Sequence, residues 1–92
     1  MSKIILRQTA RLRELLARPG CLVAPGVADA FGARLVKMEG FDAVYMTGFG
    51  TSLTRLGMPD VGLLTATEMI DNASRIAEAS ELPVIADADT GY

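Results

Sequence analysis

Apolar residues recur along this chain with two different periods, one typical of amphipathic helices and one of buried strands. Three segments place apolar residues every three or four positions with charged residues between them, which predicts helices. Short apolar runs bounded by proline or glycine separate these segments and indicate strands. The predicted helices cover residues 2–18, 29–40 and a segment beginning at 65, and the predicted strands cover 21–25, 41–47 and a run through 82–83 toward 89.

Local signals mark the ends of the helices. Asp29 can cap the second helix and Gly40 can end it, while Thr65 and Glu68 have the spacing of a capping box for the third. The apolar faces predicted for these two helices consist of Phe31, Leu35, Val36 and Met38 in the second and Met69, Ile70, Ala73, Ile76 and Ala77 in the third. The residues predicted to face outward from the third helix are Asp71, Asn72, Arg75 and Glu78.

Residues 48–64 separate the second strand from the third helix and carry four glycines and a proline. This punctuation predicts a long loop rather than a regular element. Long loops within a compact fold are usually functional, because a shorter connection would cost less ordering entropy.

Strands and helices alternate, and none of the strands shows the polar face of an antiparallel edge. This combination predicts a parallel sheet with right-handed crossovers, in which the strands are buried on both faces. Ligands of parallel folds bind at the carboxyl ends of the strands. Three polar groups are expected there: residues 45–48, Pro59 with Asp60, and Asp87 with Asp89.

Asp87 and Asp89 are the strongest chemical signal. Their spacing places them with Ile85 on one face of a strand, about 6–7 Å apart, where two buried carboxylates repel unless a cation lies between them. The chain has no histidine and one cysteine, so oxygen ligands and therefore Mg²⁺ or Mn²⁺ are favoured over zinc or copper. The alternative is a strand that ends in solvent, with two exposed aspartates at a turn.

Composition excludes several classes of function. Half of the 92 residues are hydrophobic and the net charge is −2, which leaves no broad basic surface for nucleic acid or an acidic membrane. The amino-terminal residues are interrupted by charges and form no signal peptide or membrane span. Cys21 lies among apolar residues and is expected to be buried, so a reducing, cytoplasmic location is predicted.

Four motifs together resemble the isocitrate lyase and phosphoenolpyruvate mutase superfamily over essentially the whole chain. They are residues 45–48, residues 56–62, the helix cap at 65–68 and residues 87–92. The resemblance implies an α/β fold, a parallel (β/α)8 TIM barrel, of which residues 1–92 form the N-terminal helix and roughly the first three strands. The chain is therefore expected to be truncated after the third strand and inactive alone.

The resemblance also implies a role for each matching residue. Asp87 is the expected direct Mg²⁺ ligand, and Asp60 and Asp89 are expected to hold metal-bound waters. The predicted catalytic residues are Tyr45 and Asp60, and the predicted substrate-binding residues are Tyr45, Thr47, Gly48, Phe49 and Asp87. The backbone N–H groups of Gly48 and Phe49 are expected to face the carboxylate of a 2-oxo acid.

The function implied is a Mg²⁺-dependent carbon–carbon lyase or decarboxylase, acting on a small 2-hydroxy or 2-oxo dicarboxylic acid through a metal-stabilised enolate of pyruvate or a relative, in a homotetramer. Residues 56–60 look more like the lyase branch than the phosphonate-forming mutases. Thr47 replaces the family's usual serine and keeps the hydroxyl, whereas Phe49 interrupts a glycine run, narrows the pocket and argues against methylisocitrate.

Two alternatives stand beside this interpretation. One is a phosphonate-forming or phosphonate-cleaving member of the same superfamily. The other is a non-catalytic half-barrel that associates through its sheet edges, because a whole barrel needs roughly 250 residues. Taken singly, Tyr45 could be an ordinary strand aromatic and Asp60 an ordinary loop residue.

Overall fold

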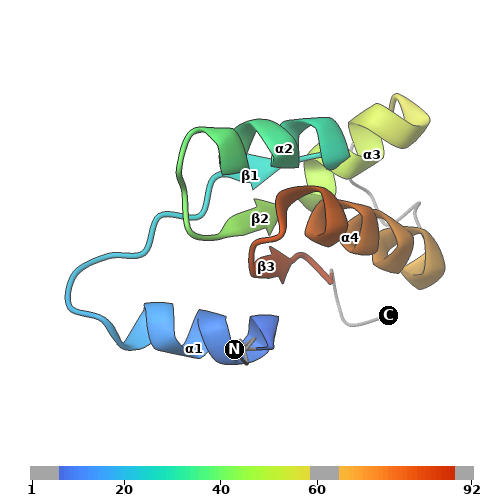
Figure 1. The fold of residues 1–92 in the computed structure, drawn as a ribbon. Helices are drawn as coiled ribbons and strands as arrows, with labels where there is room; N and C mark the ends of the chain where they lie inside the picture. The colour runs from blue at the N-terminus through green and yellow to red at the C-terminus, as the bar shows by residue number, and fades with distance from the viewer. Residues whose placement is uncertain (1–6, 59–64, 89–92) are drawn as a thin grey trace, which may run out of the picture.

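The fold is a small parallel sheet with helices, seen in a computed structural model that describes residues 7–58 and 65–88 (Figure 1). The helices are α1 (Gln8–Ala17), α2 (Ala30–Met38), α3 (Gly48–Leu56) and α4 (Ala66–Ser80). The strands are β1 (Gly26–Val27), β2 (Val44–Met46) and β3 (Val84–Ala86). Within the described residues, no helix combines the length and apolar character needed to cross a membrane.

The three strands pair in the order β1-β2-β3, and both pairings are parallel. Tyr45 in the middle strand is opposite Gly26 on one side and Ile85 on the other, and Met46 is opposite Val27 and Ala86. The predicted parallel sheet is therefore confirmed. Figure 1 shows α2 and α4 running side by side, while α1 lies apart from them. The side chains of Gln8 and Arg11 in α1 donate hydrogen bonds to the carbonyl of Glu81, which precedes β3.

The core lies between one face of the sheet and helices α2 and α4. Its buried members are Val27, Ala33, Val44, Met46, Met69, Ile76 and Leu82, with Val36, Ala73 and Val84 packed against them. Burying these side chains is the main favourable contribution to the fold, because each loses most of its apolar contact with water.

The strands are shorter than predicted, and the first one is shifted. It was expected at residues 21–25 but lies at Gly26–Val27, because the ladder to β2 begins with the carbonyl of Pro25, which accepts the Tyr45 N–H at 2.9 Å. Proline has no N–H of its own to contribute to a ladder. Cys21 lies outside the strand and is exposed, so the expectation that it is buried was wrong.

Residues 48–56 form helix α3, not the predicted loop. Thr47 begins the helix by accepting the Gly50 N–H at its hydroxyl oxygen, 3.2 Å away. Gly57 ends it in the left-handed conformation with φ of 66°. Three of the glycines that suggested a loop, Gly48, Gly50 and Gly57, therefore lie at the two ends of a helix. Residues 59–64 of the predicted loop lie outside the described residues.

The helix caps were predicted well and the helix faces less well. The Asp29 cap, the Gly40 end and the capping box of Thr65 and Glu68 are all present. The predicted inward residue Ile70 is 68% exposed, while the predicted outward residue Asn72 is 4% exposed.

Three more residues predicted to face inward are exposed, namely Phe31, Leu35 and Met38 of α2. The small residue Ala33 is buried instead, which lets α2 approach its neighbours closely. Burial of the strands on both faces also failed for β3, where Ile85 is exposed because α2 and α4 cover only one face of the sheet. Ala86, on the covered face, is exposed as well and borders a cavity beside α4.

Candidate functional site

The candidate site lies at the carboxyl edge of the sheet, where β2 and β3 end side by side. β2 ends at Met46 and is followed by Thr47, and β3 ends at Ala86 and is followed by Asp87. The backbone N–H of Asp87 donates to the carbonyl of Met46 at 3.3 Å, so Asp87 is fixed beside the start of α3.

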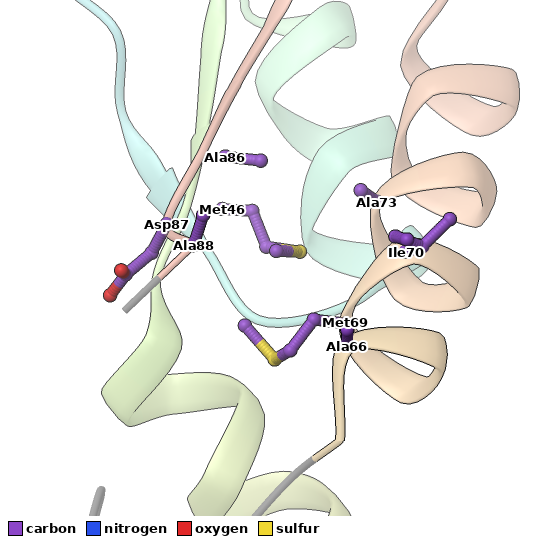
Figure 2. Close-up of a pocket in the computed structure, with 8 residues that line it drawn as sticks. All are labelled: Met46, Ala66, Met69, Ile70, Ala73, Ala86, Asp87 and Ala88. Carbon is purple, nitrogen blue, oxygen red and sulfur yellow. The ribbon is translucent and has the colours of Figure 1, made fainter. Parts of the chain in front are cut away.

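Asp87 lies on the face of the sheet that the helices leave open. Successive side chains of a strand point to opposite faces of the sheet, so the Tyr45 side chain points to the face opposite that of the buried Met46. Ile85 pairs with Tyr45, and Asp87, two residues farther on, shares their face. Figure 2 shows the Asp87 carboxylate pointing away from the cavity into which Met46 and Met69 project. The predicted placement of Ile85 and Asp87 on one face is thus reproduced, while Asp60 and Asp89 lie outside the described residues.

That cavity, of about 220 Å³, lies between α4 and the end of β3 on the core side of the sheet (Figure 2). Its walls are formed mainly by methyl, methylene and thioether groups, including those of Met46, Met69, Ile70 and Ala73. Asp87 also borders the cavity, but its carboxylate is turned away from it. A pocket for chemistry needs a few convergent polar groups. We therefore regard this cavity as packing space, and the polar chemistry belongs to the opposite face.

The N-terminus of α3 provides hydrogen-bond donors at the same edge. The N–H groups of Gly48 and Phe49 occupy the first two helical positions, where no carbonyl of the helix can accept from them. These groups and the helix dipole favour an anion at this end. The Thr47 hydroxyl accepts from the Gly50 N–H, which leaves its own proton for donation to another group. The Phe49 side chain is 55% exposed beside these donors.

Gly50 is required for the close approach of α3 to the end of β1. A Cβ atom at Gly50 would lie 2.5 Å from Cγ2 of Thr47 and 3.2 Å from Cβ of Ala28. Both distances are too short for an ordinary contact, so any larger residue would displace the first turn of α3. Gly50 therefore fixes where the N–H groups of Gly48 and Phe49 lie.

Sequence reasoning missed two polar residues behind this turn. Asn72 of α4 donates from its side-chain amide to the carbonyl of Ala28 at 2.9 Å and to the hydroxyl of Thr51 at 3.1 Å. Thr51 in turn donates to the carbonyl of Thr47 at 2.7 Å. The signal was present in the helical period, because position 72 falls between Met69 and Ile76 on the face that is buried.

A separate charged cluster joins α3 to α4 at the surface. Asp71 accepts hydrogen bonds from Arg75 and Arg55, each at 3.0 Å, and these hold the pKa of the Asp71 carboxyl below its ordinary value. All three side chains are partly open to solvent, and such pairs contribute little to stability.

The Asp71 cluster predicts a small pH-dependent effect. Because the pKa of Asp71 is lower in the folded state, its contribution is present above the unfolded pKa of about 3.9 and is lost as the pH falls through the folded value. Replacing Asp71 by asparagine should therefore lower the free energy of unfolding slightly at neutral pH and leave it unchanged in strong acid. Urea unfolding of both forms at several pH values measures this, and a difference that does not vary with pH would contradict it.

A divalent cation is chemically compatible with the part of the site that the structure describes. Asp87 offers carboxylate oxygens at the carboxyl end of a parallel strand, on the open face, and such oxygens are the ligands that Mg²⁺ prefers. Residues 7–58 and 65–88 contain no group of three acidic, histidine or cysteine side chains able to hold a metal by themselves. A complete site would therefore need ligands from outside these residues, and the predicted ligands Asp60 and Asp89 lie outside them.

Comparison with known proteins agrees with this geometry. A family model described as phosphoenolpyruvate phosphomutase matches residues 12–92. The 2,3-dimethylmalate lyase of Eubacterium barkeri is 55% identical over 87 residues, which are 95% of this chain and 30% of that protein.

Two solved structures match the fold. Oxaloacetate acetylhydrolase superposes with a TM-score of 0.87 and 43% identity, over 92% of this chain and 31% of the other. 2,3-Dimethylmalate lyase, a PEP mutase/isocitrate lyase superfamily member, superposes with a TM-score of 0.85 and 44% identity over 97% and 32%. The chain thus spans about 30% of the length of the relatives it matches.

The resemblance seen in the sequence motifs is confirmed by the matched family model and by both superpositions. The three parallel strands and their helices are part of the (β/α)8 barrel of these enzymes. The chain belongs to the phosphoenolpyruvate phosphomutase family, within the PEP mutase/isocitrate lyase superfamily.

Proposed function

We propose that the protein is a Mg²⁺-dependent carbon–carbon lyase or decarboxylase that acts on a small 2-hydroxy or 2-oxo dicarboxylic acid. One observation carries the proposal: the Asp87 carboxylate and the donor end of α3 lie at the same sheet edge, with Tyr45 on the same open face as Asp87. An acidic group for a cation beside donors for an anion suits a substrate that chelates a metal and carries carboxylates.

In this proposal the donor end of α3 binds a substrate carboxylate. The N–H groups of Gly48 and Phe49 donate to its oxygens, and the Thr47 hydroxyl adds a third donor. The Tyr45 phenol, on the same face as Asp87, donates to a substrate oxygen and helps to orient it. The exposed Phe49 ring narrows the entrance and favours compact substrates.

The proposed metal site consists of Asp87 as the direct ligand, with Asp60 and Asp89 holding metal-bound waters. An ion bound by these oxygen ligands, Mg²⁺ or in its place Mn²⁺, would neutralise the charge that develops on the oxygen of an enolate when the carbon–carbon bond breaks. Asp60 is also proposed to act in catalysis together with Tyr45. The carboxylates of the protein supply the fixed negative charge that retains the ion.

The relatives support the lyase branch. The 55% identical relative is a lyase named for a hydroxylated dicarboxylic acid, and the oxaloacetate acetylhydrolase is named for a 2-oxo dicarboxylic acid. From the family we also propose a homotetramer that works in the cytoplasm on a small molecule, without nucleic acid or membrane as a partner. A phosphonate reaction is the outcome that would point to the mutase branch.

Calorimetry of the protein in its full natural length tests the proposal. Oxalate resembles the enolate of a 2-oxo acid, so it should bind strongly in the presence of Mg²⁺ and weakly without it. Turnover should then be found with dicarboxylic acids, while ³¹P spectroscopy should show no conversion of a phosphonate. Oxalate binding that is independent of Mg²⁺, or no binding at all, would contradict the proposed function.

A further inference from the structure

Asn72 is a polar side chain placed inside the core, where a polar group is costly unless it is fully hydrogen-bonded. It is 4% exposed, and Thr51, its partner across the α3–α4 contact, is 0% exposed. The side-chain amide of Asn72 uses both of its N–H donors, one toward Ala28 and one toward Thr51. The residue therefore joins three segments of the chain: α4, the end of β1 and α3.

The direction of each hydrogen bond in this group follows from the chemistry of its members. A backbone carbonyl only accepts, so the atom of Asn72 that faces Ala28 must be its nitrogen. The same nitrogen donates to Thr51, so the Thr51 hydroxyl must accept there and give its own proton elsewhere. That proton goes to the carbonyl of Thr47, 2.7 Å away. A one-directional chain thus runs from Asn72 through Thr51 to Thr47.

This chain ends on the residue that begins α3. The Thr47 carbonyl accepts both the Thr51 hydroxyl and the Thr51 backbone N–H, the latter at 2.9 Å. A second side-chain link between α3 and α4 is the exposed pair of Arg55 and Asp71, near the C-terminal end of α3. Exposed pairs hold geometry weakly. The buried chain is therefore expected to restrain the first turn of α3 more firmly than this exposed pair does.

We propose that Asn72 and Thr51 are positioning residues, which hold the N-terminus of α3 where its N–H groups meet the substrate carboxylate. The inference rests on the proposed function, in which the first turn of α3 binds the substrate carboxylate. Neither residue touches the substrate in this proposal. They act through Thr47, and the close packing of Gly50 against Ala28 restrains the same turn from the side of β1.

The test compares threonine variants within α3. Thr51→Val keeps the shape of the side chain but removes the hydroxyl. One buried N–H donor of Asn72 then has no acceptor, and the Thr47 carbonyl loses one of its two hydrogen bonds. We expect its affinity for oxalate with Mg²⁺ present to fall roughly 10-fold or more. Thr51→Ser should restore most of it. Thr54→Val is the matched control, since the exposed Thr54 hydroxyl likewise donates to backbone carbonyls of α3, those of Gly50 and Thr51, but, among the residues that the structure describes, bonds to none in α4.

Two readouts separate positioning from general stability. Mg²⁺ binding without oxalate should change less than about twofold in Thr51→Val, and amide hydrogen exchange should accelerate at the first turn of α3 and not in α4. If the valine variant does not fold, Thr51→Ala, which adds no methyl group to the site, takes its place.

The outcomes are distinguishable. Wild-type protein that fails to bind oxalate with Mg²⁺ overturns the proposed function and this inference with it. Wild-type binding that Thr51→Val leaves unchanged, that Thr51→Ser fails to restore, or that Thr54→Val weakens equally overturns the inference alone. Equal loss of Mg²⁺ and oxalate binding in Thr51→Val also overturns it, because that pattern reports a general loss of structure.

Discussion

Replacing Asp87 by alanine is expected to weaken the joint binding of Mg²⁺ and oxalate at least about 100-fold. Removing a residue that only hydrogen-bonds a metal ligand typically lowers metal affinity about 10–100-fold, and removing the direct ligand should cost more. Turnover of the dicarboxylic acid should fall by at least the same factor. The physical reason is the loss of the fixed carboxylate that, in our proposal, binds the ion at the end of β3. Asp87→Asn, which keeps the shape and removes the charge, should show a large part of the same loss.

The matched control is Asp42→Ala. Asp42 is an exposed aspartate that precedes β2, at the opposite edge of the sheet from Asp87. Its removal changes the net charge by the same amount and should leave both affinities within about twofold, because exposed distant charges are screened. Calorimetry and a coupled turnover assay measure the effect. If Asp87→Ala and Asp42→Ala behave alike, Asp87 is not the metal ligand.

The placement of this site could be predicted because a strand has a fixed period of two. Once residues 44–46 and 84–86 are strands, the parallel register decides that Tyr45, Ile85 and Asp87 share a face. The edge at which they lie follows from the rule that parallel strands end together. These rules need no knowledge of side-chain packing. They therefore placed the strand residues correctly, whereas the prediction of which helix residues face the core was partly wrong.

Helix α3 could not be predicted from the composition of its segment. Gly48 and Gly50 lower helix propensity, and their number suggested a loop. In the structure the missing side chain of Gly50 is what lets the first turn lie against Ala28, and the resulting contacts outweigh the propensity cost. Tertiary contacts of this kind link residues about 20 positions apart and leave no local trace in the sequence.

Asn72 shows the same limit of prediction, here for a polar residue that is buried. Polarity alone assigns it to the surface, whereas the helical period assigns it to the core, and the structure follows the period. The decision depends on its partners, Ala28 and Thr51, which lie 44 and 21 residues away. The helical period therefore indicated burial, but only the partners show why a polar side chain is tolerated in the core.

The largest expected effect on stability comes from Ile76. Its side chain is 0% exposed and belongs to the core between α4 and the sheet. Ile76→Ala should lower the free energy of unfolding by about 2–5 kcal/mol, the sum of lost apolar burial and the cavity that remains. Ile76→Val, which removes one methyl group, should cost only about 0.5–1.5 kcal/mol.

Urea unfolding of the protein in its full natural length measures this series, with Glu78→Ala as the control on the same helix. Glu78 is exposed, and surface substitutions change stability by roughly 0.5 kcal/mol or less. A graded loss from valine to alanine at position 76, with no loss at 78, follows from a packed core that cannot collapse around the missing atoms. Equal losses at both positions would mean that α4 does not pack against the sheet through Ile76, and the assigned core would be wrong.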